Sequence, residues 1–136
     1  MRSRVVVDAC AAINIVSGQD THDELLGAIR AASVAITPML FTTEVANALT
    51  GYVKKGIFTA AEVIDRYGQA LSLIDEVVAD AEFGTEALAE AVRVEHPTYD
   101  LIYAILARRT GSALLTCDRR LAKLAQDLGI PLALEI

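Results

Sequence analysis

The sequence predicts an α/β fold, a three-layer α/β/α sandwich in which helices cover both faces of a mainly parallel five-stranded sheet. Short apolar runs, typical of buried strands, alternate along the chain with longer segments of helical periodicity. No repeat, low-complexity tract or linker interrupts this order. We therefore expect a single domain over residues 1–136.

The boundaries in the first half follow from strand and helix signals. Three consecutive valines lie between Arg4 and Asp8, and the alanine-rich segment after them turns into a helix. Thr37-Pro38 stops the second strand, and Gly56 ends the long helix that follows. We expect strands over 4–8, 34–36, 74–79, 113–116 and 131–136, and helices over 9–13, 23–32, 39–55, 59–73, 83–95, 99–109 and from 118.

Further along the chain, Thr59 and Glu62 have the spacing of a capping box at the start of a helix. Val77-Val78 favours a strand over a continued helix. His96-Pro97 ends the next helix, because proline cannot continue it. The last apolar stretch forms the closing strand.

Residues 98–124 carry the clearest unit: helix, turn, strand, helix. Gly111 ends the first helix, and the apolar run 113–116 fits a strand covered on both faces. Asp118 follows at once and opens the next helix. It therefore lies at the carboxyl end of a strand, where open α/β sheets place their sites.

Four acids are candidate site residues because of their positions in the predicted fold. Asp8 repeats the strand-end arrangement of Asp118, although both acids could simply cap helices. Asp100 lies in the first turn of its helix. Glu44 shares a helix face with Asn47, three residues on, and could equally be a solvated surface residue.

Carboxylates crowded at one end of a sheet repel one another unless something positive lies among them. Mg²⁺ or Mn²⁺ suits oxygen ligands of this kind, with water and phosphate completing the coordination. Such a site can hydrolyse phosphodiesters without a nucleophilic Ser, Cys or His. His22 and His96 lie in loop-like contexts and are expected to be ordinary.

Composition limits the function classes. The net charge of −6 argues against a protein that coats nucleic acid through bulk positive charge. No apolar run reaches the roughly 20 residues of a membrane span, and no signal peptide is evident, so a cytoplasmic protein is expected. Cys10 and Cys117 have no zinc spacing and are expected to be reduced and buried.

Other sites on similar folds lack their motifs. The turn after the first strand has no glycine-rich dinucleotide fingerprint, and there is no P-loop. A receiver domain would need paired acids after strand one and a late lysine. A DxDxT hydrolase would need an acid where Cys10 stands.

The segments VVVDACAAINI, TEVANALTGYVKKG and TYDLIYAILARRTGSALLTCDRRLAKLA, with a final GIPL, carry a family resemblance over the whole length. In this order and spacing the chain resembles a PIN domain, and closely the VapC toxins of bacterial toxin–antitoxin pairs. The resemblance implies the sheet order 3-2-1-4-5. It also implies a site where Asp8, Glu44, Asp100 and Asp118 converge, bind Mg²⁺ or Mn²⁺ and cut RNA.

The resemblance further implies roles for individual residues. Asp8 and Asp100 would be direct metal ligands, and Asp118 would complete the cluster directly or through water. Glu44 would hold a second metal or orient the attacking water. Thr116 matches a hydroxyl position that supports the cluster, and Asn47 would be a second supporting residue.

Position 10 departs from the family pattern. The first motif usually has Ser or Thr two residues after the first Asp, and this chain has Cys10, a weaker hydrogen-bond donor. The four acids are intact, so we expect an active domain.

The first hypothesis is a metal-dependent endoribonuclease that acts as a toxin. Its partners would be RNA and a small VapB-like antitoxin that carries the DNA-binding function, and the toxin itself would be a homodimer. Lys54, Lys55, Arg119 and Arg120 are the candidate RNA contacts, although cations near helix ends are favourable anyway. The alternatives are a PIN-like binding module with negligible catalysis and an RNA-processing nuclease without an antitoxin.

Overall fold

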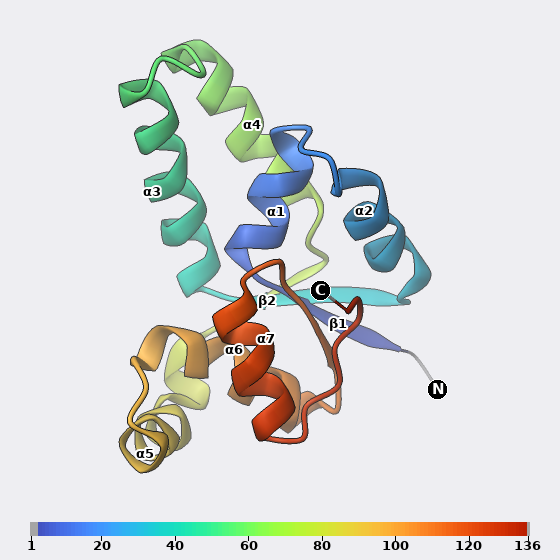
Figure 1. Ribbon diagram of the computed structural model, residues 1–136, viewed down its shortest axis with the longest axis vertical. Coiled ribbons are helices and arrows are strands. Elements are labelled where there is room, and N and C mark those ends of the chain that lie inside the picture. The colour runs from blue at the N-terminus through green and yellow to red at the C-terminus, as the bar shows by residue number, and fades with distance from the viewer. Residues whose placement is uncertain (1–2, 136) are drawn as a thin grey trace.

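The structure is a computed structural model that describes residues 3–135. A parallel sheet lies between two layers of helices (Figure 1). The predicted three-layer α/β fold is therefore confirmed. None of the helices in residues 3–135 is both long enough and apolar enough to cross a membrane.

The described sheet has four strands in the order β3-β2-β1-β4, and each neighbouring pair is parallel. Strands β1 and β2 are buried along almost their whole length, as expected for a parallel sheet covered on both faces. The strands are β1 (Arg4–Val7), β2 (Val34–Pro38), β3 (Glu76–Val78) and β4 (Ala113–Leu115).

The predicted fifth strand, residues 131–136, is reduced to one parallel bridge between Leu114 and Leu132. The N–H of Leu114 donates to the Pro131 carbonyl, and the N–H of Ala133 donates to the Leu114 carbonyl, both at 2.9 Å. This segment lies beside β4, as the predicted order requires. Because Pro131 has no N–H to donate, the pairing does not extend into a ladder. Ile136 lies outside the described residues.

The helices follow the predicted ranges to within one or two residues at most ends, and the capping box of Thr59 and Glu62 is present. On one side of the sheet, α3 and α4 form a hairpin that extends beyond it (Figure 1). The elements are α1 (Ala9–Val16), α2 (His22–Ala31), α3 (Leu40–Lys54), α4 (Ala60–Ser72), a 3₁₀ turn (Asp80–Glu82), α5 (Gly84–Val94), α6 (Thr98–Thr110) and α7 (Arg119–Asp127).

Helix α6 is the central helix on the other side of the sheet. It packs against α5, α7 and three of the strands, and every residue from Tyr103 to Ala107 is buried. Gly111 ends it in a left-handed conformation with φ of +64°. This packing fixes the position of Asp100, in its first turn.

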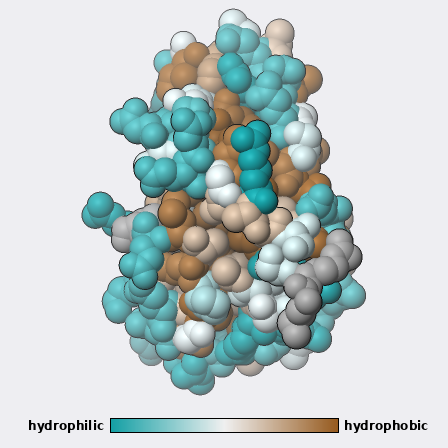
Figure 2. Space-filling view, turned by 90° about the vertical axis from the view of Figure 1, so that its right-hand side faces the viewer, coloured by the Kyte–Doolittle hydropathy of each residue, from teal (hydrophilic) through white to brown (hydrophobic). Residues whose placement is uncertain are grey.

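On the outer surface, apolar side chains gather across the middle of the face in Figure 2, between hydrophilic margins.

The carboxyl ends of three strands are tied together by hydrogen bonds. The buried hydroxyl of Thr37, on β2, donates to the carbonyl of Val7 at 2.6 Å. The N–H of Asp8 donates to the carbonyl of Leu115, on β4, at 3.1 Å. These bonds hold the chain at the point where it leaves β1.

The bond from Thr37 can be tested by substitution. We expect Thr37→Val to lower the free energy of unfolding by about 1–3 kcal/mol, because it removes a buried donor from the Val7 carbonyl without leaving a cavity. Urea unfolding followed by circular dichroism measures this. Thr50→Val is the matched control at an exposed threonine and should change stability by less than about 0.5 kcal/mol. Equal effects of the two substitutions would contradict the assignment.

Candidate functional site

All four predicted acids line one cavity of about 220 Å³ at the carboxyl end of the sheet. Asp8 follows β1 and Asp118 precedes α7, while Glu44 comes from the first turns of α3 and Asp100 from the first turn of α6. The cavity is lined by Asp8, Ala9, Cys10, Glu44, Asp100, Tyr103, Asp118 and Leu121. Acids that are far apart in the sequence therefore face one space, which we call the acidic cavity.

Asp8 is the buried member of this set, with only 3% of its surface exposed. One carboxylate oxygen accepts from the Ala11 N–H at 2.8 Å and so caps α1, and the other accepts from the hydroxyl of Thr116. Burial raises the pKa of Asp8 to about 7. The hydrogen bonds oppose this shift, and the charges of Asp118 and Glu44 add to it.

Thr116 connects the two strand-end acids. Its buried hydroxyl donates to Asp8 and accepts the N–H of Asp118 at 2.9 Å. Asp118 in turn accepts the N–H of Arg120 at 2.9 Å and caps α7. Both strand-end acids therefore cap helices and also face the acidic cavity. The capping role and the place in a candidate site, which the sequence offered as alternatives, are compatible.

Glu44 is held by Tyr103, which the sequence analysis did not select. The tyrosine hydroxyl donates to Glu44 Oε1 at 2.6 Å. Partial burial raises the pKa of Glu44; the bond from Tyr103 opposes the shift, and the charges of Asp100 and Asp118 add to it. The pKa of Tyr103 is raised mainly by burial and then by the bond to Glu44. Its position three residues after Asp100 on one helix was an available signal.

His96 was expected to be ordinary, but its Nε2 lies 2.8 Å from Oδ2 of Asp100. Both side chains are largely buried. The two residues are four positions apart, across the start of α6, so the contact follows from helical spacing once the helix boundary is known. His96 therefore fixes one oxygen of Asp100.

The chemistry of the donor set fits a divalent cation. The acidic cavity has four carboxylates in its lining and no lysine or arginine, and burial and mutual repulsion raise the pKa of two of them. Within residues 3–135, however, no three His, Cys, Asp or Glu side chains are already grouped closely enough to hold a metal ion. The acids point instead at Thr116, Tyr103 and His96. Their side chains would have to turn toward a common point to bind one.

The expectation that both cysteines are buried was wrong. Cys10 is exposed and Cys117 is half-buried, and both are free thiols. Each lies just beyond a buried strand, on the segment that leaves the sheet, rather than in the core. Cys10 itself lines the acidic cavity.

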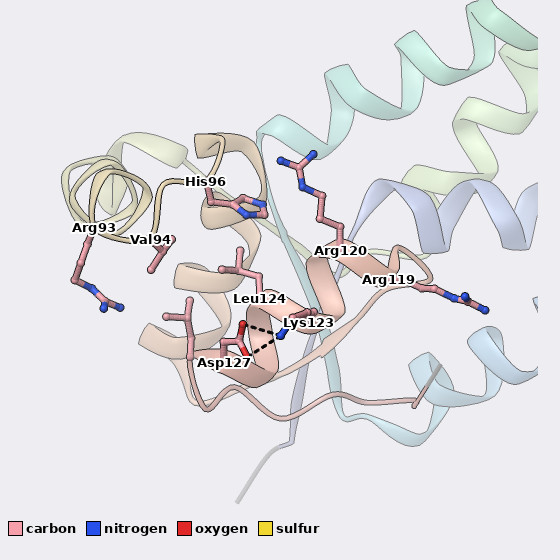
Figure 3. Close-up of a pocket in the computed structure, with 9 residues that line it drawn as sticks. Arg93, Val94, His96, Arg119, Arg120, Lys123, Leu124 and Asp127 are labelled. Atoms are coloured by element: carbon pink, nitrogen blue, oxygen red, sulfur yellow. Dashed lines mark hydrogen bonds and ion pairs between the residues drawn. The ribbon is translucent and has the colours of Figure 1, made fainter.

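A second, larger cavity of about 610 Å³ lies between α7 and the end of α5 (Figure 3). We call it the basic groove. His96 and Arg120 lie across from each other at its upper end in Figure 3, and Lys123 pairs with Asp127 at 3.3 Å. It is lined by Arg93, Val94, His96, Arg119, Arg120, Lys123, Leu124, Asp127 and Leu128. Arg119 and Arg120 were candidates from the sequence, whereas Arg93 and Lys123 were not.

The remaining candidates lie elsewhere. Asn47 is exposed, one turn along α3 from Glu44, and lines neither cavity. Lys54 and Lys55 lie at the far end of α3, about 15 Å along the helix axis from Glu44. Any contact they make with RNA would be remote from the acidic cavity.

The chain is similar in sequence and in fold to known proteins of Pyrobaculum aerophilum. The chain is 28% identical over 123 residues to "Ribonuclease VapC3" of Pyrobaculum aerophilum, covering 88% of this chain and 93% of that protein. The crystal structure of PAE2754 from Pyrobaculum aerophilum superposes with a TM-score of 0.70 at 25% identity. That superposition covers 93% of this chain and 90% of the other.

The family model described as "PIN domain" matches residues 5–127, which include all four acids and, except for Arg4, both strands that position Asp8 and Asp118. The match extends over nearly the whole sheet and every helix that contributes to the acidic cavity. The chain therefore belongs to the PIN domain family.

Proposed function

We propose that this protein is an Mg²⁺- or Mn²⁺-dependent endoribonuclease that hydrolyses phosphodiester bonds in RNA. The observation that carries this proposal is the set of four acids, from four separate segments, around one cavity that has no lysine or arginine in its lining. The name of the relative, a ribonuclease, supports RNA as the substrate.

Asp8 and Asp100 would hold the metal directly, Asp118 would complete its ligands directly or through water, and Glu44 would serve a second metal or the attacking water. A divalent cation there would neutralise the carboxylates and stabilise the negative charge that develops on the phosphate during hydrolysis.

The neighbouring side chains position these acids. Thr116 holds Asp8 and the backbone of Asp118 in fixed relation. Tyr103 fixes Oε1 of Glu44, which leaves Oε2 to take a proton from the attacking water. Burial raises the pKa of Glu44, which makes its carboxylate a better proton acceptor than an ordinary glutamate.

The biological setting is part of the same proposal. The likeness to a VapC ribonuclease supports a toxin paired with a small VapB-like antitoxin. We further propose that this toxin is cytoplasmic and homodimeric, and that its DNA contacts come from the antitoxin. A PIN-like binding module would share the fold and the partner but would not turn over RNA, so metal-dependent cleavage discriminates the two. An RNA-processing nuclease without an antitoxin would cleave RNA and yet be harmless when expressed alone.

Cleavage should depend on the acids. We expect Asp8→Asn and Asp100→Asn each to lower the cleavage rate by at least about 100-fold, because each removes a charged metal ligand. The assay uses purified protein, a panel of labelled single-stranded RNAs, and Mn²⁺ or Mg²⁺, with EDTA as the metal-free control.

Asp23→Asn, at a highly exposed aspartate on α2, is the matched control and should retain full activity. Full activity of either cavity variant would remove that residue from the site. If no RNA is cut and calorimetry shows no metal binding, the binding module is the correct interpretation.

The raised pKa of Asp8 predicts a pH-dependent stability. Because the folded-state pKa of about 7 lies above the ordinary 3.8, the stability contributed by protonated Asp8 is complete at low pH and is lost as pH rises through about 7. Without metal, Asp8→Asn should therefore be more stable than the unsubstituted protein by roughly 2–4 kcal/mol near pH 8, and the difference should shrink toward pH 4.

Urea unfolding in EDTA at both pH values measures this difference. Adding Mn²⁺ near pH 8 should stabilise the unsubstituted protein and leave Asp8→Asn nearly unchanged, because binding to the folded state alone raises stability. An equal Mn²⁺ effect on both proteins would place the metal elsewhere.

The basic groove predicts which cations contact RNA. With cleavage blocked by EDTA, Arg120→Gln should weaken binding of single-stranded RNA roughly 3- to 10-fold and lower the salt dependence by about 0.7, the loss of one phosphate contact. Lys54→Gln, at the far end of α3, should have little effect. Fluorescence anisotropy across a salt series measures both, and a larger effect of Lys54→Gln would move the RNA path to α3.

A further inference from the structure

Two cysteines that are 107 positions apart meet at the rim of the acidic cavity. The Sγ atoms of Cys10 and Cys117 lie 2.7 Å apart. Cys10 is the second residue of α1, and Cys117 lies between Thr116 and Asp118 on the segment that connects β4 to α7. Both are free thiols, and Cys10 is exposed.

The strand register brings the two cysteine residues close together. Strands β1 and β4 are hydrogen-bonded neighbours, with Val7 opposite Leu115. Cys10 follows Val7 by three residues and Cys117 follows Leu115 by two, so both lie just beyond the same paired ends. The bonds from Asp8 N–H to the Leu115 carbonyl and from Thr116 to Asp8 hold the two segments side by side.

Access to the pair is open. Cys10 lines the acidic cavity, and both cysteines line a neighbouring cavity of about 250 Å³ that also contains Asn14 and Tyr52. A small thiol or disulfide can therefore reach Cys10 from solvent. The second sulfur is already within reach of the first.

We propose that Cys10 and Cys117 form a reversible intramolecular disulfide, with a low-molecular-weight disulfide such as oxidised glutathione as the oxidant. The thiolate of one cysteine attacks the small disulfide, which forms a mixed disulfide and releases one glutathione thiolate. The thiolate of the other cysteine then attacks the protein sulfur of the mixed disulfide and releases the second glutathione thiolate. The protein loses two electrons and two protons, and oxidised glutathione is reduced to two thiols.

The crosslink would act on the fold and on the site. It joins positions far apart in the chain, so it restricts the unfolded state more than the folded one. It also ties the segment that carries Asp8 to the segment that carries Asp118, which limits how far these carboxylates can separate. This proposal rests on the placement of the sulfurs, and none of its measurements requires nuclease activity.

The experiment equilibrates the full chain in glutathione buffers of rising oxidised fraction and compares it with Cys10→Ser and Cys117→Ser. Intact mass, peptide mapping, non-reducing electrophoresis, thermal unfolding and amide hydrogen exchange are the readouts. By intact mass, the unsubstituted protein should lose two hydrogens and carry no glutathione. On the non-reducing gel it should run as a single chain. Its melting temperature should rise by roughly 10 °C or more, and exchange at residues 8–10 and 116–118 should slow.

The variants distinguish this pair from ordinary thiol chemistry. Each single-cysteine variant should keep one glutathione, because no second thiol can displace it, and should show no rise in melting temperature. Stable addition of two glutathiones to the unsubstituted protein, a disulfide between two chains, or thiols that stay reduced in the most oxidising buffer would each overturn the proposal. An equal rise in melting temperature for a variant would also overturn it.

Discussion

The parallel pairing of β1 with β4 is the constraint on which the rest of the site depends. Its register sets Val7 opposite Leu115, so the residues that follow each strand leave the sheet at one point. Asp8, Thr116 and Asp118 become neighbours for this reason. Helices α3 and α6 then need only to start near the same edge to bring Glu44 and Asp100 to the acidic cavity. A slip of one residue in this register would turn Asp8 toward the opposite face of the sheet.

The burial of Asp8 lowers the stability of the metal-free fold and at the same time favours metal binding. A carboxylate that is almost fully enclosed is disfavoured in its charged form, and the neighbouring acids add to that cost. Thr116 and the N–H of Ala11 offset part of it by donating hydrogen bonds to the carboxylate. The same burial makes Asp8 a strong candidate ligand, because a cation would relieve repulsion that protein groups relieve only partly. The acid that weakens the metal-free fold near neutral pH is therefore the one with most to gain from a metal.

The sequence was sufficient to predict features that depend on local pattern. Asp8 and Asp118 each follow an apolar run, and the sheet order that the family resemblance implies makes their strands neighbours. It was not sufficient for contacts that depend on where a helix starts or how a side chain turns. His96 was expected to be ordinary, and its contact with Asp100 follows only once α6 is known to begin at Thr98. Tyr103 was not a candidate, and its hydrogen bond to Glu44 depends on how its side chain turns. The fifth strand failed at Pro131, where an apolar pattern meets a missing backbone donor.

His96 links the acidic cavity and the basic groove, because it holds Asp100 and also lines the groove. The net charge of −6 is therefore a poor guide to substrate, because the charges are distributed unevenly. Four carboxylates and no lysine or arginine line the acidic cavity, while four basic side chains and one carboxylate, that of Asp127, line the basic groove. A polyanion drawn to the groove by these cations would have its backbone beside acids that repel it. A cation bound among those acids would cancel this repulsion and let the polyanion enter the acidic cavity. Substrate entry and metal binding would therefore be coupled through the same electrostatics.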